Sequence, residues 1–130
     1  MPFIQIDLPR ETSRHDFHPL ADAVARLYAH VMETTPAGVT VAVRELGRDR
    51  VMRGSATGPR PTVAIRCDIR RGRPDAQRDA FALALAELVE ERASELGAAE
   101  TVVYVIEGPG AWIYEDRQPS PEWSPDEART

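Results

Sequence analysis

Alternating hydrophobic and polar positions outline the first strands of the chain. Ile4, Ile6 and Leu8 alternate with less apolar neighbours, which predicts a half-buried strand over residues 3–8. A second alternation over residues 39–45 predicts another strand. Between the two strands, apolar residues recur at helical spacing from Phe17 to about Glu33. The first part of the chain is therefore expected to fold as strand–helix–strand.

The same order of patterns returns in the second part of the chain. Residues 62–70 alternate and predict a third strand, and residues 101–107 are mostly β-branched and aromatic and predict a fourth. An apolar stripe at helical spacing lies between them, where Pro74 suits the first helical position and Gly97 suits the end. The chain thus predicts two copies of one unit.

These patterns divide one domain, residues 1–130, into four segments. Repeat 1 covers about residues 1–45, and repeat 2 covers about residues 62–107. The linker at 46–61 is rich in Gly, Arg and Pro, and we expect a loop there with a short hairpin near Val51 and Met52. Prolines at positions 109, 119, 121 and 125 predict an irregular C-terminal arm over residues 108–130.

Two strand–helix–strand units in tandem predict an α+β fold. Each unit implies a right-handed parallel crossover, so we expect a four-stranded mixed sheet with both long helices on one face. The other face would carry polar side chains: Gln5, Asp7, Arg44, Arg66 and Asp68. Such a face is too polar for the core of a monomer, which predicts an oligomer that packs these sheet faces together.

Composition limits the partners, the location and the metal chemistry that we expect for this chain. A net charge of -5 argues against nucleic acid. The single cysteine, Cys67, rules out an intramolecular disulfide and fits a cytoplasmic location. We see neither a signal-peptide pattern nor an apolar run of about 18 residues, so we expect no membrane association. The three histidines are not accompanied by a cysteine pair, and no metal site is expected.

The chain contains 16 basic residues and all of them are arginine, so lysine chemistry is excluded. The remaining candidate amine is the N-terminus. If Met1 is removed, Pro2 becomes a free secondary amine on a rigid ring. An α-amine has a reference pKa of about 7.7–8.0, and burial lowers that pKa because it disfavours the cation. Pro2 is therefore a candidate general base.

Three arginines lie where the third strand ends and the second helix begins. Arg70, Arg71 and Arg73 fall in the run Arg-Arg-Gly-Arg-Pro-Asp. Guanidinium groups bind carboxylates through a planar fork, and a helix N-terminus adds positive potential. This junction predicts a clamp for a small anionic substrate that carries a carboxylate. The alternative is that these arginines are solvated loop charges.

The chain resembles the tautomerase superfamily in three features taken together. These are the Met1-Pro2 start before a strand, the repeated strand–helix–strand order and the arginine junction. The similarity is greatest to its fused members, near cis-3-chloroacrylic acid dehalogenase and malonate semialdehyde decarboxylase, and extends to 4-oxalocrotonate tautomerase (4-OT). This resemblance implies the fold described above, a homotrimer and a reaction that needs no cofactor. It also implies that Pro2 is the catalytic amine and that Arg70 and Arg73 hold the substrate carboxylate.

The resemblance assigns further residues by position. Arg71 takes the role of Arg70 if the decarboxylase is the better guide. Tyr104 corresponds to a tyrosine that helps to place a water molecule, and Glu115 to the glutamate that activates it. Tyr28 stands where the dehalogenase has a histidine in its first helix, which makes Tyr28 a candidate substrate contact.

Three functions follow from these assignments. The first is an isomerase in which Pro2 catalyses keto–enol tautomerisation of a small unsaturated 2-keto or 2-hydroxy acid. The second is hydration, dehalogenation or decarboxylation, in which a cationic Pro2 works with water activated by Tyr104 and Glu115. The third is a non-enzymatic oligomeric binding module with a vestigial pocket. A retained Met1 would favour the third, because an acylated Pro2 nitrogen is not basic.

Overall fold

The computed structural model describes residues 2–96 and 100–129, and its centre is a four-stranded sheet in the order β2-β1-β5-β6. The strands are β1 (Phe3–Leu8), β2 (Thr40–Glu45), β5 (Val63–Arg70) and β6 (Thr101–Gly108). β1 runs parallel to β2, β5 runs parallel to β6, and β1 and β5 are antiparallel. The mixed sheet predicted from two strand–helix–strand units is confirmed.

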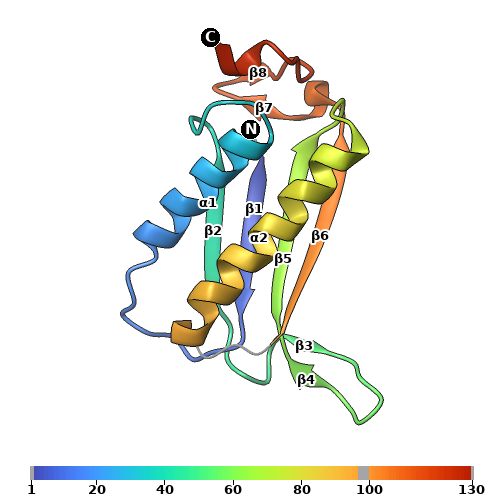
Figure 1. Ribbon diagram of the computed structural model, residues 1–130. Coiled ribbons are helices and arrows are strands. Elements are labelled where there is room, and N and C mark those ends of the chain that lie inside the picture. Colours follow the sequence, from blue (N-terminus) through green and yellow to red (C-terminus); the bar gives the residue numbers. More distant parts are fainter. Residues whose placement is uncertain (1, 97–99, 130) are drawn as a thin grey trace.

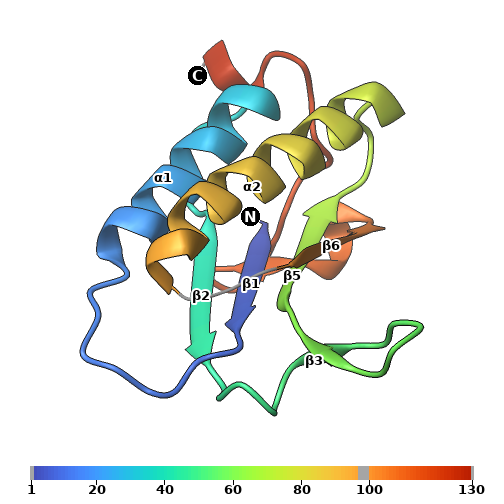
Figure 2. The ribbon, with the colours of Figure 1, turned by 60° about the horizontal axis from the view of Figure 1, so that its bottom comes forward.

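Both long helices cover one face of this sheet, as predicted (Figures 1 and 2). α1 (His18–Val31) begins with a proline in its first turn, and α2 (Asp75–Leu96) begins directly after Pro74. The expected helix end at Gly97 lies outside the described residues. None of the described helices is long and apolar enough to cross a membrane.

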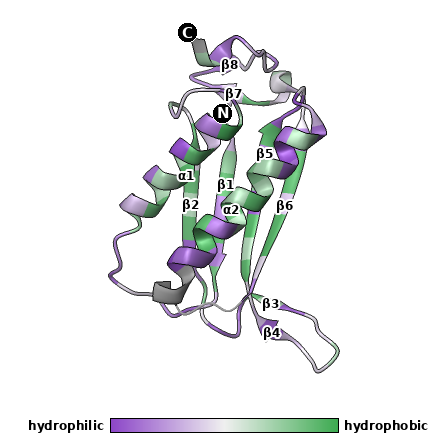
Figure 3. Cartoon of the chain, in the orientation of Figure 1, coloured by the Kyte–Doolittle hydropathy of each residue, from purple (hydrophilic) through white to green (hydrophobic). Residues whose placement is uncertain are grey.

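The hydrophobic core fills the space between the sheet and the two helices. Its residues come from alternate positions of the two central strands and from one stripe of each helix. Figure 3 shows hydrophobic positions along the strands and on both helices. The fully buried members include Ile4, Ile6, Leu8, Val63, Ile65, Cys67, Val24, Phe81, Leu85 and Val89. Burial of this apolar surface is the main favourable term in folding.

Within residues 2–96 and 100–129, no helix covers the opposite face of the sheet, and this face is largely polar. Arg44 pairs with Asp7 at 2.7 Å, and Arg66 pairs with Asp68 at 3.2 Å. The predicted composition of this face is thus confirmed. Tyr104 and Ile106 of β6 pair with Arg66 and Asp68 of β5, so their side chains lie on the same open face. Both are exposed.

The linker contains the expected hairpin. β3 (Met52–Arg53) pairs with β4 (Arg60–Pro61) in antiparallel register. This hairpin projects from the end of the sheet where β5 begins (Figure 1). It therefore lies at the opposite end from the start of β1.

The arm after β6 is more ordered than predicted. It forms a short 3₁₀ helix, η1 (Gly110–Trp112), a hairpin of β7 (Tyr114–Glu115) and β8 (Gln118–Pro119), and a second 3₁₀ helix, η2 (Glu127–Arg129). The two hairpin-loop residues, Asp116 and Arg117, have the positive φ angles of a type I′ turn. The prolines limit the length of these elements, but they do not prevent the arm from folding over the end of the sheet where β1 starts (Figure 1).

Candidate active site

The topology brings the first residues of the chain next to the arginine junction. Phe3 is paired with Asp68 across the antiparallel β1–β5 interface. Pro2 therefore lies beside the last residues of β5, where Arg70 ends the strand. Pro2 is buried, and its carbonyl accepts a hydrogen bond of 3.0 Å from the backbone N–H of Thr40.

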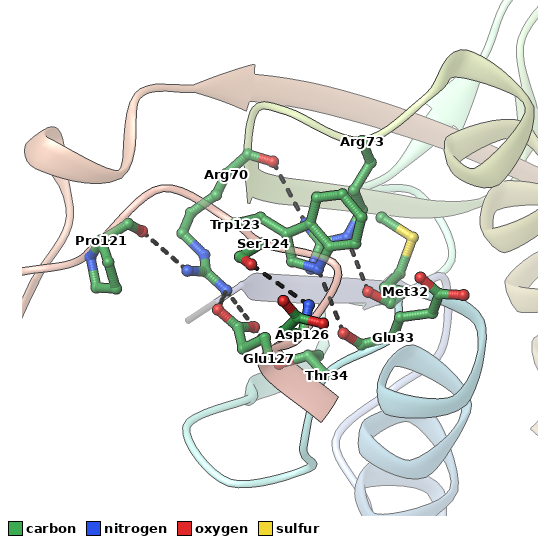
Figure 4. Close-up of polar contacts among 10 residues, drawn as sticks. All are labelled: Met32, Glu33, Thr34, Arg70, Arg73, Pro121, Trp123, Ser124, Asp126 and Glu127. Atoms are coloured by element: carbon green, nitrogen blue, oxygen red, sulfur yellow. Dashed lines mark hydrogen bonds and ion pairs between the residues drawn. The ribbon is translucent and has the colours of Figure 1, made fainter. Parts of the chain in front are cut away.

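Arg70 is buried under the C-terminal arm, with only 2% of its surface exposed. Its Nη1 donates a hydrogen bond of 2.8 Å to the carbonyl of Pro121. Its Nη2 contacts both carboxylate oxygens of Glu127, at 2.7 and 2.6 Å (Figure 4). The hydroxyl of Thr34 donates to the same carboxylate. The Nε of Arg70 has no hydrogen-bond partner in the described part of the chain.

Arg73 is the second buried cation, with 6% of its surface exposed. Its Nε donates to the carbonyl of Met32 at 2.9 Å, and its Nη1 donates to the carbonyl of Arg70 at 3.5 Å. Its guanidinium carbon lies 4.8 Å from the ring centroid of Trp123 and 5.6 Å from that of Tyr28. Burial lowers the pKa of Arg73. Its Nη2 is unpaired among residues 2–96 and 100–129.

Tyr28 belongs to the same cluster and is 1% exposed. Its ring packs edge-on against Phe81, with 5.1 Å between the ring centroids. Burial raises the pKa of the Tyr28 phenol, so the hydroxyl keeps its proton and is available as a donor. Within the described chain, that hydroxyl also lacks a hydrogen-bond partner. Three buried groups near the start of β1 therefore carry unpaired donors.

Glu127 was not identified from the sequence. It lies 57 residues from Arg70 in a proline-rich arm, and no local pattern connects the two residues. Burial raises the pKa of its carboxyl group, but the hydrogen bonds from Arg70 and Thr34 outweigh that effect and hold the pKa below its ordinary value. Glu127 is therefore ionised at neutral pH.

Three other predicted site residues lie apart from this cluster within one chain. The Arg71 side chain is 61% exposed and pairs with Glu122 at 3.2 Å. Tyr104 is 59% exposed on the open face of the sheet. Glu115 is exposed in the β7–β8 hairpin, where it is paired with Gln118 in the backbone register. The structure thus brings together Pro2, Arg70, Arg73 and Tyr28, and their roles remain predictions.

Cys67 is a buried free cysteine. Burial raises the pKa of the Cys67 thiol to about 12, so the thiolate that a nucleophile needs is scarce at neutral pH. In the described residues, no group of three His, Cys, Asp or Glu side chains is placed to hold a metal ion.

Comparison with known proteins reveals similarity in structure. No protein-family model matches the chain, and no curated protein matches it by sequence. The structure matches N1, a member of the cis-3-chloroacrylic acid dehalogenase family, with a TM-score of 0.73 and 22% identity over 92% of this chain and 84% of that chain. The chain has the fold of the tautomerase superfamily. The resemblance noted in the sequence is confirmed at that level.

Two further matches illustrate the range of proteins with the tautomerase fold. Q0, a fused 4-OT solved as a symmetric trimer, has a TM-score of 0.74 and 17% identity, and covers 91% of this chain and 94% of that chain. FG41 malonate semialdehyde decarboxylase, inhibited by 3-bromopropiolate, has a TM-score of 0.67 and 19% identity, and covers 86% of this chain and 87% of that chain. One fold thus accommodates several activities, and function has to be argued from the site.

Proposed function

We propose that the protein is an isomerase that catalyses keto–enol tautomerisation of a small unsaturated 2-keto or 2-hydroxy acid without a cofactor. The observation that carries this proposal is that two buried arginines, Arg70 and Arg73, lie at and just after the end of β5, the strand end that the sheet register places next to Pro2. Two cations withdrawn from water bind a carboxylate strongly, because the surroundings screen their charge poorly.

In the proposed reaction, the amine of Pro2, released by removal of Met1, takes a proton from the enol hydroxyl. The electron pair of the O–H bond forms the ketone, and the former double bond accepts a proton at carbon. The amine returns the proton it took, so the reaction leaves Pro2 unchanged. Pro2 is buried, and burial disfavours a protonated amine, which keeps Pro2 available as a base. Arg70 and Arg73 bind the carboxylate and stabilise the negative charge that develops on the enolate.

Assembly into a homotrimer is part of the proposal. Fused 4-OT proteins with this fold have been solved as trimers. The uncovered face of the sheet carries ion pairs together with exposed Phe3, Tyr104 and Ile106, a mixture that suits an interface between copies of the chain. Trimer formation would place Tyr104 against a neighbouring subunit.

A second candidate function is water addition with linked dehalogenation or decarboxylation. The structural matches to a dehalogenase-family protein and to malonate semialdehyde decarboxylase favour it. It needs Tyr104 and Glu115 to activate water, yet both side chains are exposed to solvent within one chain, whereas Arg70 is buried. We therefore rank it below tautomerisation, and a binding module without catalysis below both.

The test is ketonisation of phenylenolpyruvate, followed by ultraviolet absorbance. The protein with Met1 removed, as verified by intact mass, should exceed the buffer rate, and Pro2→Ala and Arg70→Met should each lose most of that excess. The matched control is Arg71→Met, which changes an exposed arginine. This variant should keep the full rate above buffer if Arg70 is the clamp. Absence of any rate above buffer in the processed protein would overturn the tautomerase proposal.

A further inference from the structure

The carboxylate of Glu127 already occupies the guanidinium group to which the proposed function assigns the substrate carboxylate. Nη2 of Arg70 contacts its two oxygens at 2.7 and 2.6 Å, and Thr34 donates to one of them. Figure 4 shows the arm passing over Arg70 so that Glu127 lies beside the guanidinium. In chemical class, this group is what a 2-keto acid would present to the same arginine.

The contact leaves part of the Arg70 guanidinium unused. Both short contacts to Glu127 come from one nitrogen, Nη2, whereas Nη1 is paired with Pro121. Nε is buried and has no partner among the described residues. A carboxylate that engaged Nε and Nη2 together would form the planar two-nitrogen fork that arginine favours. An incoming substrate can therefore make a contact that Glu127 does not make.

The charge balance of the cluster also leaves room for an anion. Arg70 is neutralised by Glu127, whereas the described ion pairs include none to Arg73. The acceptors around Arg73 are two backbone carbonyls and the faces of two aromatic rings. The pair of cations with one internal carboxylate thus keeps a net positive charge, which attracts a second carboxylate.

The segment that carries Glu127 is held by few buried contacts. Of residues 121–128, only Trp123 and Glu127 are half-buried, and the others are exposed. Its polar contacts include a hydrogen bond of 3.3 Å from Trp123 to the carbonyl of Glu33 and the exposed ion pair of Glu122 with Arg71 at 3.2 Å. The Trp123 ring also lies 4.8 Å from the guanidinium carbon of Arg73, and the amide of Glu127 donates a hydrogen bond of 3.0 Å to the carbonyl of Ser124. Segments with little buried apolar surface open at low free-energy cost.

A role for Glu127 as the catalytic base fits the geometry less well. Both of its oxygens accept hydrogen bonds from Arg70, and one also accepts from Thr34. These donors stabilise the ionised form and make the carboxylate a poor proton acceptor. The same contacts suit a carboxylate that acts as a ligand of Arg70.

We propose that Glu127 is an internal carboxylate ligand that closes the site and that a substrate carboxylate must displace it from Arg70 to bind. This inference rests on the proposed function for the role of Arg70. The arm acts as an autoinhibitory strap: it reduces the fraction of molecules that can bind substrate, and apparent affinity falls by that fraction. It also selects for substrates whose carboxylate can use both Nε and Nη2.

The test measures binding of benzoate, which has a carboxylate but no proton to move to carbon, by isothermal titration calorimetry. Glu127→Gln should bind benzoate about tenfold more tightly than the wild type, because a charge-assisted contact that competes with the ligand is lost. Glu122→Gln is the matched control: it makes the same change in the same arm, but next to the exposed Arg71, and should leave the affinity within about twofold. Circular dichroism verifies that each variant is folded.

A second measurement uses the unaltered protein. Saturating benzoate should accelerate hydrogen exchange at the amide of Glu127, which is bonded to Ser124, while amides of β5 stay protected. Tighter binding of benzoate by Glu127→Gln, together with faster exchange in the wild type on adding benzoate, supports the strap. If the proteins then fail to ketonise phenylenolpyruvate, only the proposed reaction fails. Equal or weaker binding by the folded variant, with unchanged exchange, overturns the strap whether or not the enzyme is active.

Discussion

Nε of Arg73 donates a hydrogen bond of 2.9 Å to the backbone carbonyl of Met32, the residue that follows α1. The last carbonyls of a helix lack partners within the helix, so this contact satisfies one of them. Arg73 precedes α2 by two residues, and it therefore fastens the start of one helix to the end of the other. The candidate substrate-binding arginine also has a structural role.

Arg73→Met should therefore lower stability as well as activity. The substitution removes a charge-assisted hydrogen bond to Met32 and the contacts with two aromatic rings, and we expect a loss of about 2 kcal/mol in the free energy of unfolding. Urea unfolding measures this loss. The control, Arg71→Met, changes an exposed side chain and should stay within about 0.5 kcal/mol of the wild type. Equal stability of the two variants would contradict a structural role for Arg73.

Tyr28→Phe should separate stability from function. The Tyr28 hydroxyl is buried without a partner in the described chain, so its removal relieves an unpaired polar group. We expect the variant to be as stable as the wild type or more stable by up to about 1 kcal/mol. If the hydroxyl donates to the substrate, kcat/KM for phenylenolpyruvate should fall about tenfold or more. A clear loss of stability in thermal unfolding would show that the hydroxyl has a partner in the folded protein.

The stability contributed by Glu127 should depend on pH. Its pKa is lowered in the folded protein by Arg70 and Thr34, so its contribution is present above the unfolded pKa of about 4.3 and is lost as pH falls through the folded value. The Tm of the wild type should exceed that of Glu127→Gln at pH 7. The difference should shrink progressively below about pH 4. A difference in Tm that is constant between pH 7 and pH 3 would contradict the ion pair.

The open face of the sheet gives a prediction about assembly. Ile106→Arg places a charge among exposed apolar side chains on this face and away from the helices. Sedimentation velocity should show a trimer for the wild type and a smaller species for the variant, because burying an unpaired charge at an interface is costly. Leu83→Arg, an equally drastic change at an exposed position of α2, should leave the trimer intact. A monomeric wild type would overturn the proposed homotrimer.

The four-stranded sheet and its two helices were predictable because each of these elements is encoded locally. The alternation of Ile4, Ile6 and Leu8 buries one side of β1, and the stripe that includes Phe81 and Leu85 buries one side of α2. The β3–β4 hairpin also followed from its loop composition. Such periodic patterns depend on the chain within a few residues.

The arm and its contact with Arg70 were not predictable in this way. Its prolines suggested irregular structure. The two-residue strands and the 3₁₀ turns of the arm were missed because elements this short have no sequence period. The arm doubles back tightly: a Cβ atom on Gly110 would lie 2.5 Å from the carbonyl oxygen of Pro121. The pairing of Arg70 with Glu127 depends on that path through space, so it could be recognised only in the structure.

The most direct test of the central claim compares two forms of one protein that differ only in Met1. One form retains Met1, and a methionine aminopeptidase has removed Met1 from the other. Both forms have the same side chains at Arg70 and Arg73. If Pro2 is the base, phenylenolpyruvate ketonisation should require removal of Met1, because only then is the Pro2 nitrogen an amine rather than an amide. Equal rates for the two forms, with masses verified before and after the assay, would contradict a catalytic Pro2.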